Sequence, residues 1–168
     1  MKRRTFLPLL LAAGLVPSMT LAADPGRETV GQVKVVVYFG TDGDPSVAGE
    51  RSTDADEETV KRLQGHEKLR FGHYRLLGSD TQSLYRSYEN WAQPIAGSDE
   101  ILCRFEAESQ ISDHSMRLDL ELWLSRKKIL KSGIPLSEGK PVLVLGPEWR
   151  GGRLIISVEL APSAKRGS

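Results

Sequence analysis

Residues 116–124 alternate strictly between apolar and polar side chains, and this pattern limits the possible folds more than any other. Every second position is apolar, at Met116, Leu118, Leu120, Leu122 and Leu124. The positions between them carry Arg117, Asp119, Glu121 and Trp123. Side chains in a strand alternate between two faces, whereas a helix repeats every 3.6 residues, so the segment predicts a strand with one buried face.

Residues 101–108 repeat this alternation. Ile101, Cys103, Phe105 and Ala107 share one face, and Arg104, Glu106 and Glu108 share the other. Paired as a hairpin with residues 116–124, the segment predicts a sheet with a wet, charged face. Cys103 is then a small apolar core side chain. As the one cysteine of the chain, it excludes an intramolecular disulfide.

Five further segments are rich in β-branched and aromatic residues and are bounded by turn residues. They span residues 33–39, 69–77, 127–131, 142–145 and 154–160, with 33–39 and 142–145 expected to be buried and 146–152 expected to be a turn. Residues 54–63 predict one short surface helix capped by Asp54. Seven strands with short turns predict an antiparallel two-sheet sandwich over residues 33–160, immunoglobulin-like in architecture, with a barrel as the alternative.

The amino terminus has the pattern of an export signal. Three basic residues precede an apolar run, and Thr20-Leu21-Ala22 offers a cleavage site, so residues 1–22 predict a cleavable signal peptide. Arg3-Arg4-Thr5-Phe6-Leu7 resembles the twin-arginine motif, with a general secretory signal as the alternative. We therefore expect a bacterial protein exported to the periplasm or the medium.

The charge and hydrophobicity of the remaining chain argue against several classes of partner. Of the 23 basic residues, three lie in the predicted signal peptide, which leaves 20 against 22 acidic residues, a net charge of −2. This balance gives no field to hold nucleic acid or an anionic membrane. No later stretch has the roughly 20 apolar residues that span a bilayer. Residues 23–32 predict a flexible leader, and residues 161–168 a disordered tail.

The sequence carries none of the common catalytic and cofactor motifs. The sequence has no Gly-x-Ser-x-Gly elbow, no His-Glu-x-x-His, no P-loop and no dinucleotide fingerprint. It therefore predicts a protein that is not an enzyme and binds no cofactor. The acidic residues between 42 and 57 leave calcium binding open, although solvated turns explain Asp42 and Asp44 without a metal.

Tryptophan and arginine, which dominate binding hot spots, occur at unusual places in this sequence. Trp123 falls on the polar face of its strand, and Trp149-Arg150 lies in the predicted turn. Trp91, in the unassigned segment 81–95, is expected to cover one end of the core, and for Trp149 both roles stay open. The predicted partner-binding residues are Trp123, Arg117, Asp119, Glu121, Trp149 and Arg150.

These observations favour a non-catalytic binding or assembly module of the bacterial cell envelope. It would dock a protein partner through the aromatic and charged sheet face or through a sheet edge. One alternative is a small exported hydrolase that uses dispersed carboxylates, such as Glu106 with Glu121, or the histidines His66, His73 and His114. Another is a barrel that carries a small ligand. The hydrolase requires at least two of these five residues to meet in one cavity.

Overall fold

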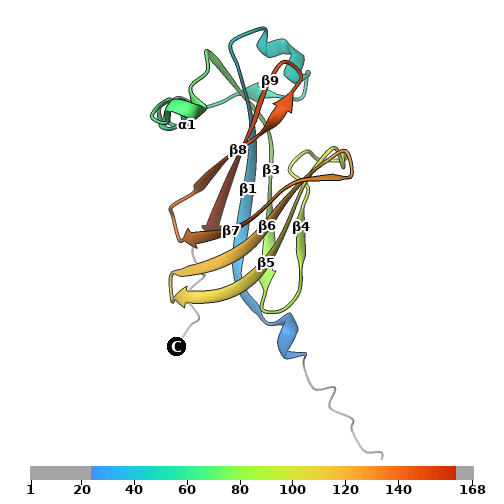
Figure 1. Ribbon diagram of the computed structural model, residues 1–168, viewed down its shortest axis with the longest axis vertical. Helices are drawn as coiled ribbons and strands as arrows, with labels where there is room; N and C mark the ends of the chain where they lie inside the picture. Colours follow the sequence, from blue (N-terminus) through green and yellow to red (C-terminus); the bar gives the residue numbers. More distant parts are fainter. Residues whose placement is uncertain (1–23, 162–168) are drawn as a thin grey trace, which may run out of the picture.

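The computed structural model describes residues 24–161, which form two antiparallel β-sheets and one short α-helix (Figure 1). The predicted signal peptide, residue 23 of the leader and residues 162–168 of the tail lie outside the described residues. Ala161, the first residue of the predicted tail, is instead the last residue of a strand.

Nine strands build the two sheets. They are β1 (Thr29–Thr41), β2 (Thr53–Asp54), β3 (His73–Tyr85), β4 (Asn90–Ala92), β5 (Ile101–Ser112), β6 (Ser115–Leu124), β7 (Lys127–Ser137), β8 (Val142–Trp149) and β9 (Gly152–Ala161). The five-stranded sheet has the order β2-β3-β1-β9-β8, and the four-stranded sheet is the meander β4-β5-β6-β7. The predicted two-sheet fold is confirmed. The described strands do not close into a barrel, so the barrel alternative is wrong.

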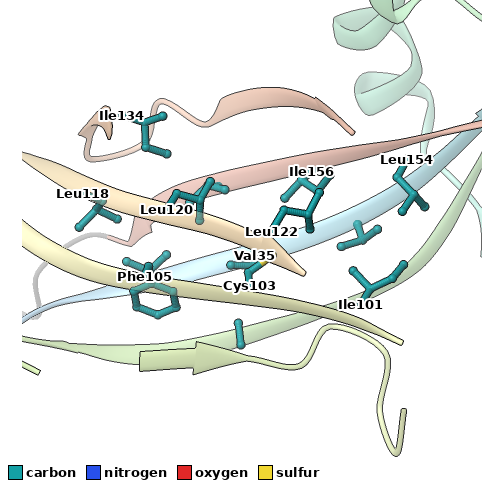
Figure 2. Close-up of a cluster of buried hydrophobic side chains, with 14 of the residues drawn as sticks. Val35, Ile101, Cys103, Phe105, Leu118, Leu120, Leu122, Ile134, Leu154 and Ile156 are labelled. Atoms are coloured by element: carbon teal, nitrogen blue, oxygen red, sulfur yellow. The ribbon is translucent and has the colours of Figure 1, made fainter. Parts of the chain in front are cut away.

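The hydrophobic core lies between the two sheets (Figure 2). Val35 and Ile156 face it from the five-stranded sheet, and Phe105 and Leu120 face it from the other; all four are almost fully buried. The predicted hairpin between residues 101–108 and 116–124 is confirmed, because β5 pairs with β6 and their apolar positions face inward. Cys103 is fully buried there, and burial raises the pKa of its thiol to about 12.

Helix α1 (Glu57–Gln64) covers part of the outer face of the five-stranded sheet. Leu63 is fully buried in a second cluster with Tyr38, Tyr74 and Ile155 from three strands. The helix begins later than predicted because Asp56 is its cap, accepting a hydrogen bond from the Thr59 amide at 2.8 Å. The predicted cap, Asp54, lies in β2 and pairs with Arg75.

Several predicted boundaries are wrong. Strand β1 begins at Thr29, so residues 29–32 belong to the centre of a sheet rather than to a flexible leader. Strand β3 runs through the predicted turn at Gly78, where a register shift absorbs the irregularity. Residues 142–145 lie in an edge strand and are half-buried rather than buried. Strand β7 continues to Ser137, well past the predicted end at residue 131.

Candidate functional site: the outer face of the four-stranded sheet

Two tryptophans lie together on the outer face of the four-stranded sheet. Trp91 of β4 is 41% exposed and Trp123 of β6 is half-buried. Their ring centroids are 5.7 Å apart, with an angle of 57° between the ring planes. We call this surface, made by the outward side chains of β4 to β7, the tryptophan face.

Strand alternation places both rings outside the core. Asn90 and Ala92 of β4 are buried, so Trp91 between them points outward. Leu122 faces the core, and Trp123 next to it therefore points away from the core, as predicted. The prediction that Trp91 covers one end of the core is wrong, because its ring packs on Trp123 instead.

Each of the two indole N–H groups donates a hydrogen bond to a carboxylate. The Trp123 Nε1 group donates to Oε2 of Glu121 at 3.0 Å, and the Trp91 Nε1 group donates to Oε1 of Glu89 at 3.3 Å. The Lys128 ammonium group lies 5.6 Å from the centre of the Trp123 ring, within cation–π range. Hydrogen bonds and a cation therefore fix the ring orientations.

Glu121 is the buried anion of this face, with only 5% of its surface exposed. Lys128 Nζ lies 3.1 Å from its Oε1, and Arg104 and Lys131 lie at 3.7 and 3.8 Å. Burial raises the pKa of the carboxyl, but the hydrogen bonds from Lys128 and Trp123 and the positive charges of Lys128 and Arg104 outweigh it. The net pKa lies below its usual value.

Every cation of the tryptophan face has an anionic neighbour. Arg104 also pairs with Glu89 and Glu106, Lys131 pairs with Asp119 at 2.9 Å, and Arg117 pairs with Glu108 at 2.7 Å. The predicted residues Arg117, Asp119, Glu121 and Trp123 thus lie on one face. Sequence analysis missed Glu89, Trp91, Lys128 and Lys131, which only strand pairing brings next to them.

Trp149 and Arg150 lie elsewhere. A two-residue turn with positive φ at Arg150 (47°) and Gly151 (77°) places Trp149 opposite Gly152 at the end of β8. The Trp149 ring is 8% exposed, packs edge-on against Phe39 and donates from Nε1 to Glu100 at 2.9 Å. The Arg150 guanidinium lies 4.2 Å from the ring centre. Trp149 belongs to the core and is not part of the tryptophan face.

The residues named for a hydrolase do not form a catalytic arrangement in one cavity. His114, in the β5–β6 turn, contacts Glu138 at 3.0 Å beside a cavity of about 570 Å³. His66 follows α1 and lines a different cavity. Glu106 and Glu121 share the tryptophan face, but the lowered pKa of Glu121 opposes a role as a general acid.

The acidic segment from 42 to 57 has local structural roles. Asp42 accepts a hydrogen bond from the Gly72 amide, and Asp44 caps the 3-10 helix η2 (Pro45–Ala48). Asp54 and Asp56 serve as described above. Within residues 24–161, no group of three His, Cys, Asp or Glu side chains is arranged to hold a metal ion. The arrangement of these side chains therefore does not support the hypothesis that the segment binds calcium.

Between residues 24 and 161, no helix is long and apolar enough to cross a membrane. The α-helix of this region, α1, has eight residues. Comparison of the chain with protein-family models, with curated proteins and with solved structures found no match.

Proposed function

We propose that the chain is an exported, non-catalytic binding or assembly module of the bacterial cell envelope. It docks a protein partner through the tryptophan face. The observation that carries the proposal is the contacting pair of Trp91 and Trp123 outside the core. Tryptophan supplies a large, rigid contact area at binding surfaces, and here both rings are already oriented before any partner arrives.

The charges around the rings support binding rather than catalysis. Arg104, Lys128 and Lys131 surround Glu121, whose lowered pKa opposes a role as a general acid near neutral pH. Fixed ion pairs on a docking surface select the partner by complementary charge and set its orientation. The export part of the proposal rests on the pattern of residues 1–22 alone.

The experiment is photo-crosslinking of the tagged mature protein in intact cells, followed by quantitative mass spectrometry. Wild type is compared with the variants Trp91→Ala and Trp123→Ala. Tyr88→Ala is the matched control, because Tyr88 is 42% exposed and Trp91 is 41% exposed. We expect one dominant envelope partner that the control retains and both tryptophan variants lose.

Two results would contradict the proposal. One is the absence of any reproducible partner in the wild-type sample. The other is equal recovery of the partner by the wild type and both tryptophan variants, which would place docking on another surface. Circular dichroism of each variant confirms that any lost crosslink does not come from unfolding.

A further inference from the structure

Strand β8 is an edge strand whose residues Val142–Leu145 carry neither a charge nor a proline, although Pro141 and Pro147 flank them. On the side away from β9, no described strand pairs with Val142–Leu145. Between Pro141 and Pro147 the sequence is Val-Leu-Val-Leu-Gly, with no charge. Natural sheet edges commonly carry lysine, inward charges or proline, which block the addition of another strand. This edge leaves its backbone groups available over four apolar residues.

An apolar groove of about 660 Å³ runs beside this edge. Val142 and Val144 pack toward the main core, whereas Leu143 and Leu145 pack toward the second cluster on the outer side of the sheet. There they line the groove together with Leu69 of the 3-10 helix η3 (Glu67–Leu69). Figure 1 shows α1 and β8 on the same side of the molecule.

The rim of the groove is rich in basic side chains, and no ion pair within 4.0 Å is formed by its Arg62 or Lys68, although Arg62 acts on the Asp56 carboxylate from a longer distance. Arg62, His66 and Lys68 line it, against one acidic residue, Glu67. Among residues 24–161, neither Arg62 nor Lys68 has a carboxylate within 4.0 Å, and both side chains are exposed. An apolar floor beside unpaired cations is complementary to a ligand that carries both apolar groups and carboxylates.

We propose that the groove binds an extended, acidic segment of a partner protein, which adds to β8 as a further strand. Its backbone pairs with the free edge at Val142–Leu145, and its apolar side chains at alternate positions enter the groove. Carboxylates at other positions of that same face reach Arg62 and Lys68, because the side chains on the opposite face of the added strand point away from the groove. Strand addition of this kind takes affinity from main-chain hydrogen bonds and specificity from pockets for alternate side chains. The site is separate from the tryptophan face and does not depend on the proposed docking there.

The charge of the rim favours this occupant over a second copy of the chain. A two-fold pairing of β8 with β8 presents the same surface on both copies. Arg62 and Lys68 of one copy would then approach their counterparts on the other, which like-charge repulsion opposes. An acidic strand meets the same cations with attraction.

The test uses the mature protein and three capped hexapeptides. In the first, the groove-facing positions (every second residue) are glutamate, valine and glutamate, with threonine at the positions between them. The second has lysine in place of both glutamates, and the third is the valine–glutamate peptide N-methylated at every residue. We expect the first to bind and to slow amide hydrogen exchange within residues 142–145. The second loses the carboxylates and the third loses main-chain pairing, so calorimetry should show each to bind at least about tenfold more weakly.

The matched protein variants separate the rim from general charge. Arg62→Glu combined with Lys68→Glu should weaken the valine–glutamate peptide at least about tenfold. Lys127→Glu, at a lysine that is also exposed but lies at the start of β7, outside the groove lining, should leave binding unchanged. Both changes are on the surface, and circular dichroism checks the fold.

Four outcomes would overturn the proposal. The first is that the N-methylated peptide binds as tightly as the unmethylated one, and the second is that the rim variant binds the valine–glutamate peptide as tightly as the wild type does. The third is a dimer, detected by sedimentation, in which the amides of residues 142–145 are protected from hydrogen exchange without peptide. The fourth is that the protein binds phosphatidylglycerol vesicles and does not bind the peptide. The third outcome would assign the edge to a second copy, and the fourth would assign the groove to lipid. None of them bears on the crosslinking test of the tryptophan face.

Discussion

The tryptophan face and the β8 groove are both outer surfaces of a sheet, but they differ in whether their cations form ion pairs. On the tryptophan face each of the four cations has a carboxylate within 4.0 Å, and the buried Glu121 links three of them. The charges of the first surface are paired with one another at short distance, whereas Arg62 and Lys68 at the second surface have no carboxylate within 4.0 Å among the described residues.

The difference follows from what lies over each sheet. Helix α1 packs Leu63 onto the five-stranded sheet, so the outer positions there are apolar and the helix brings its own cations to the edge. Over the four-stranded sheet no described helix packs, and cross-strand ion pairs take the outer positions. Arg104 stands opposite Glu121, which stands opposite Lys131.

The largest expected effect tests the covered sheet. Leu63→Ala removes a fully buried side chain from the second cluster and should lower the free energy of unfolding by about 2–5 kcal/mol, because the cavity is only partly refilled. Urea denaturation measures it. Val47→Ala, at a residue 41% exposed, is the control and should stay within about 0.5 kcal/mol. A loss below about 1 kcal/mol for Leu63→Ala would show that α1 contributes little to the sheet.

The next effect tests the ion pairs of the tryptophan face. Glu121→Gln removes the buried charge that Lys128, Lys131 and Arg104 surround and should lower the free energy of unfolding by about 1–3 kcal/mol at neutral pH. Denaturant titration measures this loss. Glu50→Gln, at an exposed glutamate with no ion pair, is the control.

The same variant predicts a pH dependence. The pKa of Glu121 in the folded protein lies below the ordinary value of 4.5, so its stabilisation is fully present above that pH. It disappears as the pH falls through the folded pKa. The difference in unfolding free energy between wild type and Glu121→Gln should therefore close in acid. A difference that persists at low pH would assign the effect to packing rather than to charge.

A smaller effect is expected for the aromatic pair. Trp123→Ala removes the contact with Trp91 and the cation–π contact with Lys128, and should lower the free energy of unfolding by about 1 kcal/mol. Thermal unfolding measures the loss. A loss of about 4 kcal/mol, as for a core tryptophan, would mean that the pair is structural rather than a docking surface.

The smallest effect is expected at the groove. Arg62→Glu and Lys68→Glu remove cations with no ion pair among the described residues, so each should change the free energy of unfolding by no more than about 0.5 kcal/mol. Arg104→Ala is the contrasting variant, since it breaks pairs with Glu89, Glu106 and Glu121 and should destabilise more. Equal losses for all three would remove the distinction between the two surfaces.

Strict alternation made part of this structure predictable from sequence. The faces of β5 and β6 follow directly from residues 101–108 and 116–124, and so does the outward position of Trp123. Trp91 was misassigned because its strand has three residues, too few to show a period. Its neighbours Asn90 and Ala92 are both buried, but one is polar and one is apolar, so their polarity does not indicate which face of the strand points to the core.

The groove escaped prediction for a different reason. The run from Val142 to Leu145 has the composition of a central strand with two buried faces, and it occupies an edge instead. Both of its faces are partly covered, one by the core and one by the cluster under α1. Only the three-dimensional position of α1 distinguishes the two cases, and no local pattern contains that information.

The two sheets also differ in when they can be completed during synthesis. The meander β4-β5-β6-β7 joins strands that follow one another along the chain, so each strand pairs with one that was synthesised just before it. Strand β1 lies between β3 and β9, and Val35 pairs with Val158 near the end of the chain. Pairings of such long sequence separation form slowly. The four-stranded sheet therefore needs no residue beyond Ser137, whereas the free edge of β1 is covered only once Gly152–Ala161 is available to pair with it.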